Sequence, residues 1–185
     1  MEATRILMDE HRVIERVLAA LEKAAGAAGT ATAVKPEFFL ESADFIKGFA
    51  DGCHHAKEEK VLFEEMVKAG IPREGGPVGA MLAEHEQGRA FVRAMRAGAE
   101  KWQAGDVTGR TEAVAAANGY VSLLRGHIRK EDAILFPLAD RAIPLDAQQL
   151  VTDAFERVEH EETGEGVHEK YLALAEKLEK DSLGS

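Results

Sequence analysis

The sequence predicts an all-α protein, an up-down-up-down four-helix bundle with an additional C-terminal helix. Apolar residues recur at helical spacing along nearly the whole chain, and no segment shows sustained alternation of apolar and polar residues. Segments rich in glycine and proline separate the helical stretches. The residues that begin at His54 are echoed by those that begin at His127, which indicates two αα-hairpins in tandem.

The first hairpin is expected within residues 2–69. Its first helix should cover about 2–25, because apolar residues share one stripe with a histidine: Leu7, His11, Ile14, Leu18 and Leu21. A run of small residues, 26–33, then interrupts the pattern. Pro36 suits the first turn of a second helix, which we expect to continue to about residue 69.

The second hairpin follows the clearest loop of the chain, residues 70–77, which is rich in glycine and proline. A third helix is expected over residues 78–103. Asp106 can cap a fourth helix over residues 108–140. Pro137 should bend that helix near its end, because proline cannot supply the backbone hydrogen bond.

A fifth helix is expected outside the repeat. Asp146 can cap it, and it should end near residue 180, with an interruption or kink around Gly164 and Gly166. We therefore expect a bundle domain over residues 1–142 and a C-terminal helical extension over residues 143–185. The extension could pack across the bundle or form a subunit contact, so a homodimer is one expectation.

The composition is that of a soluble globular protein, with 45% apolar and 30% charged residues. The formal charge of -10 disfavours nucleic acid and anionic membranes as partners, because phosphates would be repelled. No apolar run approaches the roughly 20 residues that span a bilayer. The single cysteine suits a reducing compartment, so we expect a cytoplasmic protein.

Each half of the repeat offers the same types of metal ligand. It supplies one histidine and later a histidine and a glutamate four residues apart, which therefore share a helix face. The histidines lie on stripes of apolar residues that should face the core. The six candidate ligands are His11, His54, Glu58, His85, His127 and Glu131.

Polar groups on a buried stripe cost free energy unless they are paired or bound to a metal. Imidazole and carboxylate together favour iron, manganese or zinc, whereas calcium prefers oxygen ligands alone. Two glutamates from opposite helices could bridge two ions, and two histidines would complete each ion. We expect two iron ions, with manganese or zinc less favoured; an interaction bundle without metal is the alternative.

A choice of register arises at His54 and His55, since each has a glutamate four residues later. The Leu-Phe pair that follows both motifs aligns His54 with His127 and therefore selects Glu58. His55 and Glu59 are then expected to lie beside the ligands or at the surface.

Five further residues allow two interpretations each. Glu86 could fill a coordination position, and His160 or His168 could do so if the fifth helix folds over the bundle; otherwise the two histidines lie at the surface. Cys53 is expected to be a small buried apolar residue rather than a redox-active thiol. Tyr120 is expected to be a core aromatic residue, with a hydrogen bond to bound oxygen as the alternative.

The ligand pattern resembles that of the haemerythrin-like (HHE) family over about residues 3–140. That family has a histidine, a His-x-x-x-Glu motif, a histidine and a second such motif, in that order. The resemblance implies a four-helix bundle with a non-haem di-iron centre, bridged by an oxo or hydroxo group. Oxygen carriers of the family have a second histidine on the third helix, where this chain has Arg89. They also have an aspartate five residues after the last histidine, whereas the motif here places Glu131 four residues after His127. These departures argue against reversible oxygen carriage.

The resemblance implies a protein that binds or senses oxygen, peroxide or nitric oxide. The expected partner is therefore a small diatomic ligand or peroxide. Two alternatives stay open. One is turnover of peroxide or oxygen in a catalase-like or ferroxidase-like reaction, and the other is storage of iron or its delivery to iron centres.

Overall fold

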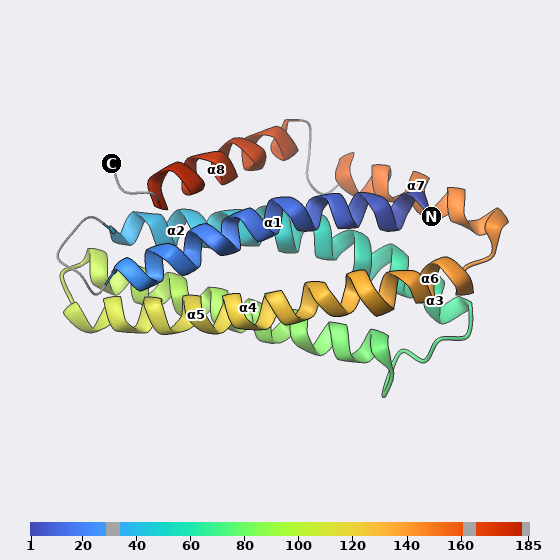
Figure 1. Ribbon diagram of the computed structural model, residues 1–185, viewed down its shortest axis with the longest axis horizontal. Helices are drawn as coiled ribbons and strands as arrows, with labels where there is room; N and C mark the ends of the chain where they lie inside the picture. Colours follow the sequence, from blue (N-terminus) through green and yellow to red (C-terminus); the bar gives the residue numbers. More distant parts are fainter. Residues whose placement is uncertain (29–33, 161–165, 183–185) are drawn as a thin grey trace.

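The computed structural model describes residues 1–28, 34–160 and 166–182. These residues form an elongated helical bundle without a β-strand, which confirms the predicted all-α fold (Figure 1). Within the described residues, no helix combines the length and apolarity that crossing a bilayer requires.

The first hairpin begins with α1 (Glu2–Ala27). Its return helix starts at α2 (Pro36–Phe45), with proline in the first turn as predicted, and passes through η1 (Ile46–His55) and η2 (Glu58–Leu62) into α3 (Phe63–Lys68). The two η segments are π-helical, with a wider turn than an α-helix, and such segments are frequent at functional sites.

The second hairpin consists of α4 (Pro77–Gln103) and α5 (Val107–Lys130), which continues through the π-helical η3 (Glu131–Leu135) into α6 (Phe136–Ala142). Asp106 caps α5 as predicted, because its carboxylate accepts a hydrogen bond of 2.9 Å from the Thr108 backbone N–H. Both halves of the repeat therefore change to a π-helical turn at the glutamate of the His-x-x-x-Glu motif.

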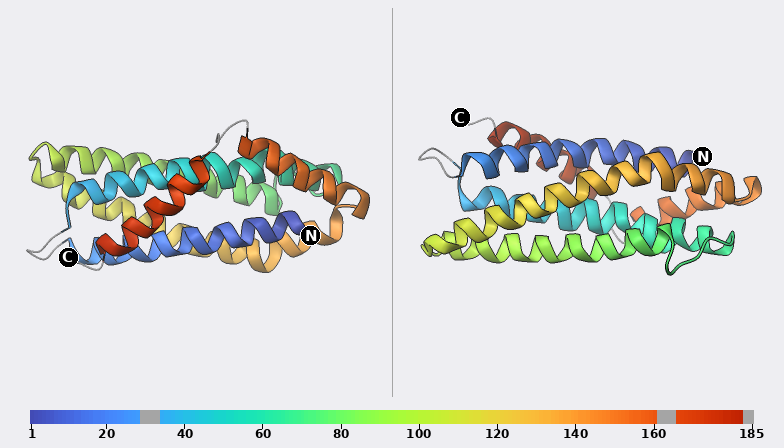
Figure 2. Two further views of the ribbon diagram at one scale, coloured as in Figure 1. Left: turned by 90° about the horizontal axis from the view of Figure 1, so that it is seen from above. Right: turned by 60° about the horizontal axis from the view of Figure 1, so that its bottom comes forward.

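The C-terminal part consists of α7 (Leu145–Val158) and α8 (Val167–Ser182), which both pack along the bundle against α1 (Figure 2). The prediction that Asp146 caps this part is wrong: Pro144 precedes the helix, and Asp146 lies in the first turn, where its charge favours the helix dipole. Gly166 precedes α8 with a φ of 77°, whereas Gly164 lies outside the described residues.

Two apolar clusters fill the interior, and the candidate ligands lie between them. In α1, Leu7 belongs to one cluster and Ile14 to the other, with His11 in between. In α4, His85 separates Met81 from Met95 in the same way. The bundle thus places a layer of polar side chains in the middle of an otherwise apolar core.

Candidate metal centre

The helices bring all six predicted ligand residues together in the interior. Each of the six residues is at most 2% exposed. Their donor atoms, together with one of His55, form two groups, and the atoms of each group lie within 4.8 Å of one another. One group consists of His11, His54, Glu58 and Glu131, and the other of His55, Glu58, His85 and His127.

The two carboxylates lie between the two groups. Glu58 contributes to both, because its oxygens lie 3.6 Å from His54 Nε2 and 3.5 Å from His85 Nε2. Glu131 has one oxygen 3.2 Å from His11 Nε2 and the other 3.2 Å from His127 Nε2. Either carboxylate could therefore bridge two ions.

His55 corrects our expectation. It is buried, its ring stacks on that of His85 at a centroid distance of 3.8 Å, and it belongs to the second donor group. The internal repeat could not reveal it, because the residue that matches it in the second half is Ile128. The usable signal was Asp51, four residues earlier, whose carboxylate lies 3.3 Å from His55 Nδ1. Glu59 lies beside the donors, as expected.

Every histidine of the two groups has a carboxylate at its Nδ1. Such a carboxylate accepts the Nδ1 proton, so that the Nε2 lone pair is left to face the interior. This arrangement is typical of histidines that bind metals, since it fixes both the tautomer and the orientation of the ring. The pairs are His11–Asp132 at 2.7 Å, His54–Glu10 at 2.9 Å, His55–Asp51 at 3.3 Å, His85–Glu59 at 2.7 Å and His127–Glu84 at 2.9 Å.

The supporting carboxylates repeat the internal symmetry. Glu10 precedes His11, the candidate ligand of α1, and Glu84 precedes His85, the candidate ligand of α4. Each glutamate contacts the His-x-x-x-Glu histidine of its own half. The lysine before each motif glutamate completes the pattern: Lys57 Nζ lies 2.6 Å from Glu10, and Lys130 pairs with Glu84. The repeat thus extends beyond the candidate ligands to the residues that hold them.

Arg89 occupies the position of the additional third-helix histidine in oxygen carriers. Its guanidinium donates to Asp51 and Glu59, the carboxylates that support His55 and His85, and to the exposed Glu86. Arg89 therefore holds the supports of two donors in place. His55, from the second helix, supplies a further imidazole in the group that contains His85.

Several polar atoms at this centre lack the partners that buried groups normally have. Within the described residues, His11 Nε2 and both carboxylate oxygens of Glu58 and of Glu131 are buried without a hydrogen bond. His85 Nε2 and His127 Nε2 face each other at 3.0 Å, where two lone pairs would repel unless a cation or a proton lies between them. Leaving such groups unsatisfied is costly. A metal ion would satisfy them, so these residues fit the group that their chemistry suggests.

Without metal, the two carboxylates differ in their affinity for a proton. Burial and the nearby charge of Glu131 raise the pKa of Glu58 well above its usual value. Burial also opposes ionisation of Glu131, but the rings of His11 and His127 hold its pKa below the usual value. Burial lowers the pKa of His54 to about 4, which keeps this imidazole neutral and available as a ligand.

The other candidates lie apart from the two donor groups. Glu86 is bound to Arg89 through its exposed carboxylate, and neither Glu86 nor His160 has an atom in either group. His168 lies instead near Cys53, Glu10 and Glu159, beside the centre. Cys53 is buried, as expected.

Residues 2–139 match the family model described as Hemerythrin HHE cation binding domain. The chain belongs to the haemerythrin family. Its His/Glu clusters fit a metal site, in agreement with the cation-binding character of this domain. Two mycobacterial relatives share 24% identity over 178 residues, which cover 96% of this haemerythrin-family chain and 69% of each relative. They are the uncharacterized proteins Rv1995 of Mycobacterium tuberculosis and Mb2018 of Mycobacterium bovis. No solved structure matches the chain significantly.

The supporting carboxylates should matter for metal affinity. Replacing Glu84 by glutamine removes the negative charge next to His127 Nδ1–H and leaves only the weaker amide oxygen as acceptor, so we expect the dissociation constant of the metal to rise by about 10–100-fold. Competition with a chelator of known affinity measures this change. The control is Glu86→Gln, which alters an exposed carboxylate nearby that contacts no donor histidine and should leave the affinity unchanged. Equal effects of the two substitutions would contradict the role of Glu84.

Proposed function

We propose that this haemerythrin-family protein holds two iron ions and binds or senses oxygen, peroxide or nitric oxide. The observation that carries the proposal is the pair of buried donor groups that share Glu58. Two groups with a common carboxylate, and a second carboxylate between them, are suited to a dinuclear centre. The mixture of imidazole and carboxylate supports iron over calcium or magnesium.

The proposed ligands divide unequally between the two ions. His11 and His54 would hold one ion, whereas His55, His85 and His127 would hold the other. Glu58 belongs to both groups, and Glu131 of the first group has its other oxygen 3.2 Å from His127 of the second. The ion with two histidines would keep more coordination positions for a small molecule. A bound di-iron centre would supply electrons and open coordination positions to a small oxidant or to nitric oxide.

The chain around the proposed ions has two tasks. The apolar clusters on both sides exclude water, which strengthens electrostatic interactions at the centre. The five carboxylates at Nδ1 hold the rings in one orientation and keep their Nε2 atoms directed inward. Phe136 stacks on His11 at a centroid distance of 5.5 Å and limits the space next to the group that has two histidines.

Metal analysis and absorption spectroscopy test this proposal. The protein loaded anaerobically with ferrous iron should retain two irons per chain after gel filtration and develop near-ultraviolet absorption on exposure to oxygen. Separate additions of oxygen, peroxide and nitric oxide should show which of them changes the spectrum. Retention of less than one iron per chain, with zinc and manganese equally poor, would exclude a dinuclear metal protein.

Turnover of peroxide is a second candidate function, favoured by the unequal histidine numbers of the two groups. An enzyme of this kind should consume peroxide in proportion to its bound iron and well above the rate of free iron. Stoichiometric reaction that stops after one equivalent would support sensing or binding instead.

A further inference from the structure

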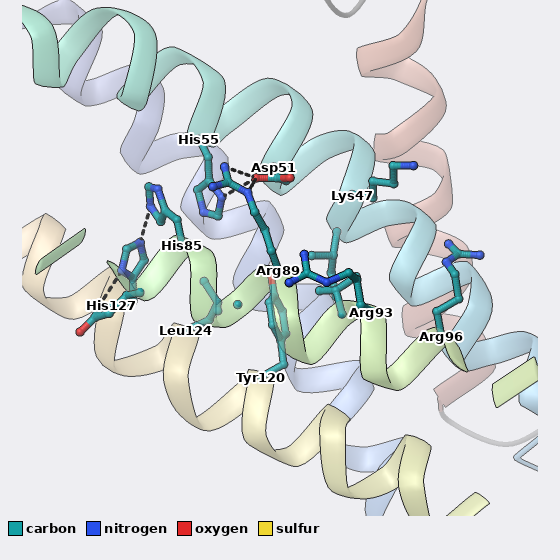
Figure 3. Close-up of a pocket in the computed structure, with 14 residues that line it drawn as sticks. Lys47, Asp51, His55, His85, Arg89, Arg93, Arg96, Tyr120, Leu124 and His127 are labelled. Carbon is teal, nitrogen blue, oxygen red and sulfur yellow. Dashed lines mark hydrogen bonds and ion pairs between the residues drawn. The ribbon is translucent and has the colours of Figure 1, made fainter. Parts of the chain in front are cut away.

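A cavity of about 310 Å³ opens beside the second donor group, between η1, α4 and α5. The imidazoles of His55, His85 and His127 form one end of it, as Figure 3 shows. A water molecule takes about 30 Å³ of liquid, so the cavity has room for on the order of ten heavy atoms. A diatomic molecule or peroxide needs far less, and this size lies at the lower end of small-molecule sites.

The lining of this cavity has more cationic than acidic side chains, although the whole protein is acidic. Arg89, Arg93, Arg96 and Lys47 line it, and they face only two acidic residues. Both acids are already neutralised: Asp51 pairs with Arg89 at 2.6 Å, and Glu84 pairs with Lys130 and contacts His127.

Two of the lining cations are available to a ligand. Arg89 is bound to three carboxylates and Arg96 to Asp44, but Lys47 and Arg93 have no ion pair among the described residues. Figure 3 shows the Arg93 guanidinium turned toward Arg89 and Tyr120, and the residue is exposed, so this cation lies at the mouth of the cavity. Unpaired cations at the mouth favour an anionic ligand.

Tyr120 adds a second, independent indication. The residue is only 1% exposed and lines the cavity, yet its hydroxyl group has no hydrogen-bond partner in the described part of the chain. A buried hydroxyl without a partner is costly and is normally satisfied by protein, water or ligand. A polar atom of a ligand in the cavity would receive this hydrogen bond.

The rest of the wall is apolar and provides space for a hydrocarbon body. Ile46, Val92 and Leu124 contribute aliphatic surface, and Gly88 has no side chain. A Cβ atom at Gly88 would lie 3.6 Å from the side chains of Tyr120 and Leu124, which is ordinary van der Waals contact. The glycine therefore leaves room that a larger residue would fill.

We infer that this cavity binds a small organic carboxylate with an apolar body, next to the donor histidines. The carboxylate is held by Arg93 at the mouth, and the body lies over Gly88 and Leu124. This inference goes beyond the proposed function, since the ligand is larger than oxygen, peroxide or nitric oxide. Neither Glu58 nor Glu131, the proposed bridging carboxylates, lines the cavity.

Calorimetry with octanoate on the iron-loaded 185-residue chain tests the inference. We expect saturable binding with a dissociation constant of about 0.1–1 mM, as for a fragment of this size. Octylammonium should bind at least tenfold more weakly, and 1-octanol several-fold more weakly. Binding of octylammonium as tight as that of octanoate would overturn the inference.

Two substitutions locate the ligand. Gly88→Leu should fill the cavity and weaken octanoate binding at least tenfold, and the milder Gly88→Ala, which meets no clash, should weaken it less. Arg93→Gln should weaken it about fivefold, whereas the matched control Arg110→Gln, at another exposed arginine, should have no effect. Unchanged binding in Gly88→Ala, Gly88→Leu and Arg93→Gln would place octanoate elsewhere, including on the metal.

The iron content and the absorption spectrum of each sample separate this inference from the proposed function. Intact iron without octanoate binding would refute the cavity ligand alone. Octanoate binding that responds to Arg93 in a protein unable to hold iron would refute the di-iron proposal alone.

Discussion

Replacing Glu58 by methionine is expected to abolish iron retention and, at the same time, to stabilise the metal-free protein by about 1–2 kcal/mol. Glu58 contributes to both donor groups, so neither ion keeps a complete set of ligands. In the metal-free protein its two buried oxygens have no hydrogen bond, and burial together with Glu131 raises its pKa. Methionine has a similar shape and removes this cost.

The matched substitution Glu131→Met should have the opposite effect on stability. Burial opposes the charged forms of His11 and His127, but in the metal-free protein Glu131, 3.2 Å from each, helps to raise the pKa of both rings, so its loss should destabilise that protein by on the order of 2 kcal/mol. Urea unfolding of chelator-treated protein measures both changes, and metal analysis should show that both variants lose iron. Destabilisation of the metal-free protein by Glu58→Met would contradict the view that the buried glutamate at position 58 serves metal binding and not stability.

Replacing His54 by alanine should leave at most one tightly bound iron per chain, whereas His55→Ala should retain two. His54 is one of only two histidines in its donor group, while His55 is one of three in the other. Removal of His55 also opens a position toward the cavity. We therefore expect His55→Ala to bind azide more tightly than the unaltered protein, by about tenfold or more, which is about 1.4 kcal/mol.

Iron analysis after gel filtration and an azide titration followed by absorption measure these two variants. The two residues are adjacent and similarly buried, so both variants lose one imidazole from the core. A difference in iron content between them therefore reports on the site and not on the loss of a buried ring. Equal iron contents for both variants would contradict the unequal division of histidines between the two ions.

Most of the fold could be predicted from the sequence, because helical periodicity and the glycine- and proline-rich breaks are local signals. The loop predicted over residues 70–77 and the cap at Asp106 depend on a few neighbouring residues. The cap was predicted correctly, and the loop ends one residue earlier than predicted, because Pro77 begins α4. Asp146 was predicted wrongly as a cap, because its sequence context does not reveal that the helix starts directly after Pro144. The π-helical turns at Glu58 and Glu131 gave no signal in the apolar pattern.

From the sequence, the candidate site could be predicted only for residues that both halves of the repeat share. The repeat identified six residues, and the structure brings all six together. It also contained the supporting residues Glu10 and Glu84, but their partners depend on how two distant helices face each other. His55 has no counterpart in the second half, and symmetry therefore argued against it.

The sequence by itself determined the bundle, its internal symmetry and the polar layer, because helix periodicity and the spacing of histidine and glutamate act within one or two turns. Only the tertiary structure decided that His55 joins the donors, that Arg89 braces two supporting carboxylates, and that Tyr120 and Arg93 face a common cavity. These relations join separate segments of the chain. Several of them involve residues of η1, where the π-helical turn changes the angle between neighbouring side chains. Such relations depend on packing distances that no local pattern contains.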